Sequence, residues 1–98
     1  RADRVQQRRV SAQRRQQLAP LKKQMQEAEK TVDRLATELA RLDAALADPA
    51  LYADPQRTQK TTVERGQIAK KLGEAEVAWM DATAAYEDAE LAAQDVSG

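Results

Sequence analysis

The most constraining feature of this sequence is the regular spacing of apolar residues in its first half. Nine of them follow one another at intervals that alternate between three and four: Leu18, Leu21, Met25, Ala28, Val32, Leu35, Leu39, Leu42 and Leu46. Heptad spacing of this kind gives a helix one apolar seam that packs against another helix. At 1.5 Å per residue, the seam predicts a rod of about 42 Å.

A second seam with the same alternation occupies the other half of the chain. Its members are Ile68, Leu72, Ala75, Trp79, Ala82, Tyr86, Ala89 and Ala93, and its extension would include Val96. The position of Trp79 and Tyr86 on this seam favours a role in the core over base stacking. The chain therefore contains two helices, each with one apolar face.

The segment between the seams contains two Asp-Pro pairs, Asp48-Pro49 and Asp54-Pro55. Each pair is a helix-start signal, because the Asp side chain caps free amides and proline is favoured at the first helical position. We expect helix 1 over about residues 18–47, a tip over 48–55 that includes a short helical turn, and helix 2 over about 56–95.

A connection this short returns the second helix antiparallel to the first. The predicted fold class is all-α, a two-helix antiparallel coiled-coil hairpin with a short helical turn at its tip. Folding about the midpoint pairs residues whose numbers add up to about 103, which sets Leu35 against Ile68 and Leu18 against Tyr86. Because the two seams satisfy each other within one chain, we expect a monomer.

The seam fails before Leu18, where Ser11 and Arg14 occupy positions that would be apolar. Pro20 adds a break, because it cannot donate to the carbonyl of Gln16, so helix 1 either kinks or begins there. We expect residues 1–17 to be a basic linker or helix extension and residues 18–98 to form the hairpin.

Composition excludes most enzymatic chemistry. The chain has no His and no Cys, which removes imidazole or thiolate metal sites and nucleophilic catalysis by Cys or by a Ser-His pair. Its three glycines make no phosphate-binding loop. We therefore expect no catalytic site, no metal site and no cofactor in this chain. It has no apolar run long enough to span a bilayer and does not begin with Met. These features favour a soluble, cytoplasmic, internal or C-terminal piece of a larger protein.

The net charge of zero hides opposite charges at the two ends. Residues 1–23 contain eight basic residues and one acidic residue, whereas residues 72–98 contain seven acidic residues and no basic one. Heptad positions place basic residues on one outward stripe of helix 1, a feature suited to a phosphate backbone. Alternatively, the hairpin brings the two ends together and they neutralise each other. Both hypotheses remain open from the residues alone.

Three segments resemble a known family: Arg14-Arg15-Gln16-Gln17-Leu18-Ala19-Pro20-Leu21-Lys22-Lys23, the tip from Leu42 to Pro55, and Gly73-Glu74-Ala75-Glu76-Val77-Ala78-Trp79-Met80. They are similar to the C-terminal coiled-coil domain of bacterial ABC-F proteins, including Uup-type and YheS-type members. The tip pattern Leu-x-Asp-Pro-x-Leu-Tyr followed by a late Trp is the most specific part. The resemblance covers roughly residues 8–93.

The resemblance implies a parent protein with two fused ATP-binding cassettes, where ATP and Mg would bind, and with roles at the ribosome or on nucleic acid. The chain would then be an accessory arm that contacts RNA or DNA, with ribosomal RNA as the expected target and no membrane partner. The residues that match the family's basic entry to helix 1 are Arg8, Arg9, Arg14, Arg15, Lys22 and Lys23. The alternative is a structural spacer or protein-interaction module that docks on its own ATPase cassettes.

Overall fold

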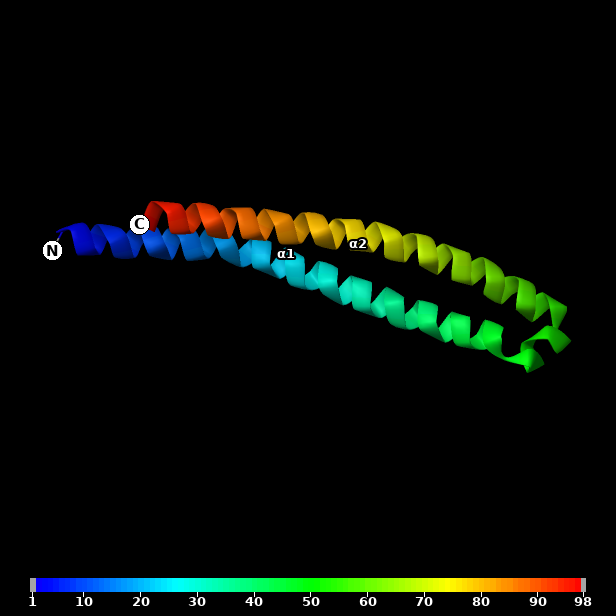
Figure 1. Ribbon diagram of the computed structural model, residues 1–98. Coiled ribbons are helices and arrows are strands. Elements are labelled where there is room, and N and C mark those ends of the chain that lie inside the picture. The colour runs from blue at the N-terminus through cyan, green and yellow to red at the C-terminus, as the bar shows by residue number, and fades with distance from the viewer. Residues whose placement is uncertain (1, 98) are drawn as a thin grey trace.

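The chain folds into two long helices joined by a short turn (Figure 1). The computed structural model describes the backbone of residues 2–97 and the side chains of residues 2–94. Helix α1 spans Ala2–Ala47, the 3-10 turn η1 spans Pro49–Ala53, and helix α2 spans Pro55–Ser97. They form an extended hairpin 78 Å long and 15 Å across. The predicted fold class is confirmed.

The two predicted seams form the interface between the helices. All nine seam residues of α1 and all eight seam residues of α2 are buried or half-buried. Leu42 is the most deeply buried, at 2% exposure, and Leu35 follows at 5%. Trp79 and Tyr86 are half-buried on this seam, as the core interpretation predicts. The side chain of Val96 lies outside the described residues.

The tip is held by caps from the two predicted Asp-Pro pairs. The Oδ1 atom of Asp48 accepts a 3.0 Å hydrogen bond from the Ala50 amide, and Oδ1 of Asp54 accepts one of 3.1 Å from the Arg57 amide. Each acceptor satisfies an amide that has no partner inside its own helix. Leu51 is buried at 7% exposure and anchors the turn against the helices.

The register between the helices differs from the expected one. Cross-helix contacts join residues whose numbers add up to 105–108 rather than about 103: Arg41 with Glu64, Arg14 with Ala93, and Arg65 with Asp43. The pairing of Leu18 with Tyr86 is displaced accordingly, and Leu18 lines a hollow with Ala89 and Ala93. The reason is the position of η1, which continues outward beyond the end of α1, so that the chain reverses after it (Figure 1).

Helix α1 begins at Ala2 and continues through Pro20. Of the two alternatives at Pro20, a kink or a helix start, the helix start is therefore wrong, although Pro20 still lacks an amide to donate. Because Arg14 lies beside Ala93, the first turns of α1 extend beyond the end of α2 (Figure 1). The division of the chain at residue 17 stays a prediction, since α1 crosses it without interruption.

Candidate nucleic-acid interface

Helix α1 carries all six predicted contact residues in its first half. Five of them are exposed: Arg8, Arg9, Arg15, Lys22 and Lys23. Arg8, Arg15 and Lys22 recur every seven residues, so they follow one flank of the helix at intervals of about 10.5 Å along its axis. We call these three residues the basic flank.

Arg14 is placed differently from the other five. It is half-buried, and its Nη1 atom donates a 3.0 Å hydrogen bond to the backbone carbonyl of Ala93 in α2. The position of Arg14 in the heptad turns its side chain toward α2. A guanidinium near the C-terminal end of a helix also interacts favourably with the helix dipole. This arginine therefore acts within the hairpin, joining its two ends.

Arg4 extends the basic flank, although the sequence analysis did not select it. A shallow surface hollow on α1 is lined by Arg4, Gln7, Arg8, Ser11 and Arg15. The heptad, continued backward, assigns Arg4 to the seam, but this part of α1 lies beyond the end of α2. The signal that could have found it is the spacing of four residues between Arg4 and Arg8, which puts both on one face.

The salt bridges of the described side chains lie in the tip half of the hairpin. Nε of Arg65 is 2.8 Å from Oδ1 of Asp43, and Nη2 of Arg41 is 2.6 Å from Oε1 of Glu38 and 3.9 Å from Oε1 of Glu64. The hydrogen bond with Arg41 lowers the pKa of Glu38, and the bond to Asp43 raises the pKa of Arg65. Two of these pairs, Arg65 with Asp43 and Arg41 with Glu64, join α1 to α2 near the tip.

No salt bridge joins the basic residues of α1 to the acidic end of α2 among the side chains of residues 2–94. Glu90 instead interacts with the hydroxyl of Tyr86, and this hydrogen bond together with burial raises the pKa of Tyr86. Asp95 lies outside the described side chains. Mutual neutralisation through direct ion pairs is thus not observed in this part of the chain.

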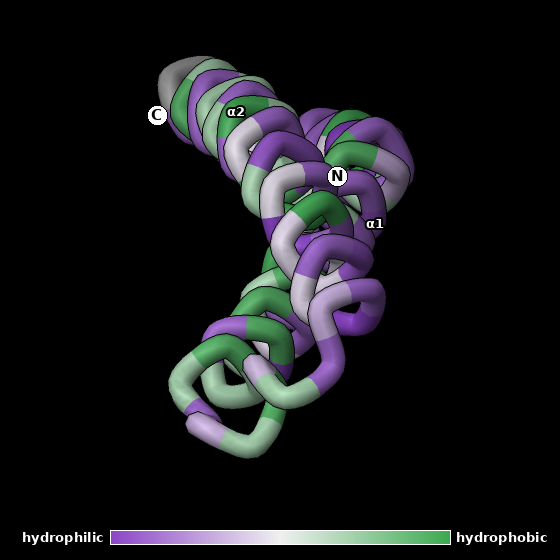
Figure 2. The backbone as a smooth tube through the Cα atoms, turned by 90° about the vertical axis from the view of Figure 1, so that its right-hand side faces the viewer, coloured by the Kyte–Doolittle hydropathy of each residue, from purple (hydrophilic) through white to green (hydrophobic). Residues whose placement is uncertain are grey.

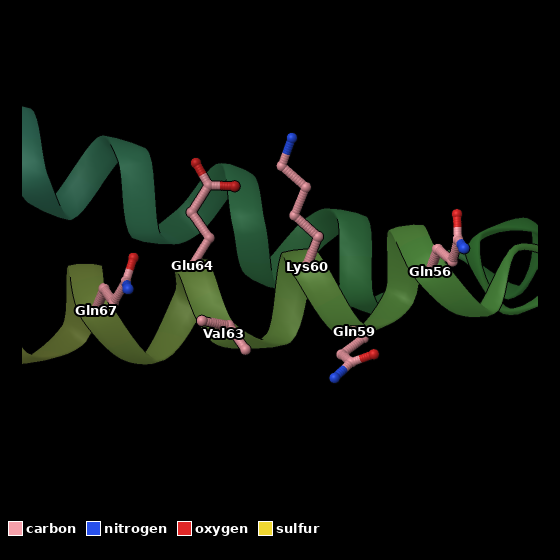
Figure 3. A pocket seen from close by; sticks show the side chains of 6 residues that line it. All are labelled: Gln56, Gln59, Lys60, Val63, Glu64 and Gln67. Atoms are coloured by element: carbon pink, nitrogen blue, oxygen red, sulfur yellow. The ribbon is translucent and has the colours of Figure 1, made fainter.

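The described residues show no catalytic group. A hollow near the tip, on one face of α2, is lined by Gln56, Gln59, Lys60, Val63, Glu64 and Gln67. Figure 3 shows Lys60 and Glu64 extending to one side of the helix and Gln59 to the other, so these polar groups do not converge. Within residues 2–94, no three acidic side chains gather in a way that could hold a metal ion.

Comparison with known proteins identifies the hairpin. Neither helix, over the part that the structure describes, has a stretch long and apolar enough to cross a membrane. No curated protein and no solved structure matches the chain. The sequence pattern of the ABC transporter C-terminal domain matches residues 19–84, about two thirds of the chain. The chain therefore belongs to this family, the coiled-coil C-terminal domain found in ABC-F proteins such as Uup.

Proposed function

We propose that this hairpin is an accessory arm of an ABC-F ATPase that contacts nucleic acid, with ribosomal RNA as the expected target. The observation that carries the proposal is the exposure of the basic flank and of Arg9 and Lys23, none of which forms an ion pair with the side chains of residues 2–94. Exposed cations release counterions from a phosphate backbone when they bind it.

The shape of the hairpin supports the same role. The basic flank lies on the half of the 78 Å rod that contains both termini, opposite the tip (Figure 1). The cations repeat along one flank of a continuous helix, which suits a run of successive phosphates better than a single anionic group. The basic flank consists of cations that contact phosphates rather than of groups that read base edges. Binding should therefore tolerate many nucleic-acid sequences.

The test is a titration of labelled RNA and duplex DNA with the 98-residue chain at several salt concentrations. Replacing Arg15 and Lys22 by Gln should lower the slope of log K against log salt by about 1.8 on duplex DNA and about 1.4 on single strands. The matched control replaces Lys70 and Lys71 of α2 by Gln, which changes the net charge equally. The slope of the control should stay close to that of the unmodified chain.

The alternative function is a spacer or protein-interaction module that docks on the ATPase's own cassettes. Exposed apolar side chains on α2, among them Val77 and Met80, favour protein contacts on that helix. Absence of binding to RNA and DNA at low salt, or an equal loss in the control variant, would reject the nucleic-acid arm in favour of this alternative.

A further inference from the structure

Helix α2 has a second apolar stripe on the side that faces away from α1. It consists of Gly73, Val77, Met80, Ala84 and Leu91, and we call it the outer stripe. Val77, Met80 and Leu91 are 53%, 57% and 59% exposed. Since successive residues of a helix are turned by about 100°, these positions lie opposite the half-buried seam that contains Trp79. Figure 2 shows hydrophobic segments alternating with hydrophilic ones along α2.

The spacing of the outer stripe is the spacing of a helix-packing surface. Intervals of four, three and four residues from Gly73 to Ala84 follow a heptad, as on the inner seam. Glu87 occupies the next position of the row, and Leu91 resumes it seven residues after Ala84. A Cβ atom added at Gly73 would meet nothing within 4 Å, so the backbone of α2 is open to close approach there. Helix α2 therefore has two apolar faces. The inner seam packs against α1, whereas the outer stripe packs against no other helix among the described residues.

Carboxylates border the outer stripe on both sides. Glu74, Asp81 and Asp88 follow one border at intervals of seven residues, and Glu76 and Glu90 lie along the other. No basic residue occurs from residue 72 onward. Among the described side chains, none of these acids forms a salt bridge, although Glu90 interacts with Tyr86. The stripe thus lies in a negative field that repels nucleic acid and anionic lipid.

We propose that the outer stripe of α2 docks an amphipathic helix of a partner protein whose apolar face is bordered by Lys and Arg. The apolar spacing selects a helix, and the two rows of carboxylates select basic borders. This surface is separate from the basic flank of α1, so the hairpin would hold a protein on one helix and nucleic acid on the other.

A second copy of this chain fits the outer stripe poorly. Antiparallel packing that sets Val77 against Met80 of the other copy would bring Glu74 close to Asp81 of that copy. Like charges in such positions are destabilising. The basic half of α1 does not supply the partner either, because it lacks an exposed apolar face. Among the described residues of α1, Val5 is the single large apolar side chain that is exposed.

The experiment uses the 98-residue chain and a synthetic three-heptad helical peptide with Leu and Ala on one face and Lys on both borders. Fluorescence anisotropy should show binding, and a scrambled peptide of the same composition should bind at least about tenfold more weakly. Replacing Val77 and Met80 by Gln should weaken binding about tenfold, whereas the control Val5→Gln, on α1 and 49% exposed, should not. Glu74→Gln with Asp81→Asn should weaken binding and reduce its dependence on salt.

Three results would overturn the proposal. Equal binding of the scrambled peptide would reduce the interaction to charge alone. Amide chemical shifts that move outside residues 73–91 would place the peptide elsewhere. If sedimentation shows a dimer, and if Val77→Gln with Met80→Gln dissociates it, the stripe binds a second copy of the chain. Circular dichroism of each variant checks that the hairpin is folded, and unchanged RNA binding by the stripe variants separates this result from the proposed function.

Discussion

The hydroxyl of Tyr52 donates a 2.6 Å hydrogen bond to the backbone carbonyl of Leu46. Leu46 lies in the last turn of α1, where helix carbonyls have no intrahelical partner. The hydroxyl of Thr58 completes the arrangement from α2 by donating to the carbonyl of Leu51 at 2.9 Å. The Leu-x-Asp-Pro-x-Leu-Tyr pattern therefore has a structural reason, since its Tyr closes the end of one helix while its Asp caps the turn.

Tyr52→Phe should lower the free energy of unfolding by about 1 kcal/mol, because it removes the donor to Leu46 and keeps the ring. Urea unfolding followed by circular dichroism measures the change. Thr31→Val serves as a control, since the hydroxyl of Thr31 bonds only within its own helix, to Glu27. An unchanged midpoint for Tyr52→Phe would show that this bond does not stabilise the tip.

Leu42→Ala should destabilise the hairpin more than Tyr52→Phe does, because Leu42 is only 2% exposed at the interface of the two helices. We expect a loss of about 2–5 kcal/mol, a large part of the total for a domain of this size. The matched control is Leu91→Ala, because Leu91 is 59% exposed and should change stability little. Similar losses in both variants would contradict the assignment of the seam.

The seam could be predicted from sequence because burial on a helix follows directly from spacing. The register could not, since it depends on where the chain reverses, and that is decided by bonds such as Tyr52 to Leu46 at the tip. The start of α1 was left open, since residues 1–17 were expected to be either a basic linker or a helix extension. Residues with good helix propensity continue a helix after its apolar seam has ended.

The candidate site was predictable in part. Charge and heptad position placed Arg8, Arg15 and Lys22 on an exposed flank. The heptad also placed Arg14 on the seam, but its partner, the carbonyl of Ala93, could not be predicted because it depends on the register. The outer stripe was overlooked because the inner seam already accounted for the amphipathic pattern of α2, and only the structure gives the exposure of Val77 and Met80.

The pair formed by Glu38 and Arg41 predicts a dependence of stability on pH. The hydrogen bond from Arg41 lowers the pKa of Glu38 in the folded chain. A carboxylate with a lowered pKa contributes stability that is fully present above its unfolded pKa, about 4.3, and is lost as the pH falls through the folded value. The melting temperature should therefore fall less between about pH 5 and pH 3 in Glu38→Gln than in the unmodified chain.

Thermal unfolding at several pH values provides this measurement. Glu29→Gln is the control, since Glu29 is exposed on the same helix and forms no salt bridge with the described side chains. Both carboxylates are near the surface, so the difference between the variants should be small and should shrink in high salt. If the melting temperature falls equally at low pH in Glu38→Gln and in the unmodified chain, the Glu38–Arg41 pair does not cause the loss.

Gly73→Ala should stabilise the hairpin and weaken its docking at the same time. The added methyl group meets nothing within 4 Å, and Gly73 lies inside α2, where alanine is favoured over glycine by about 0.5–1 kcal/mol. If a partner helix packs closely on the outer stripe, the methyl group added at residue 73 would occupy space that the partner's side chains fill. Gly66→Ala is the control, because Gly66 is equally open and lies on the same face of α2, one heptad before the first residue of the outer stripe. Chemical unfolding should show a gain for both variants, whereas peptide binding should decrease only for Gly73→Ala, and an equal decrease for both would place the contact elsewhere on α2.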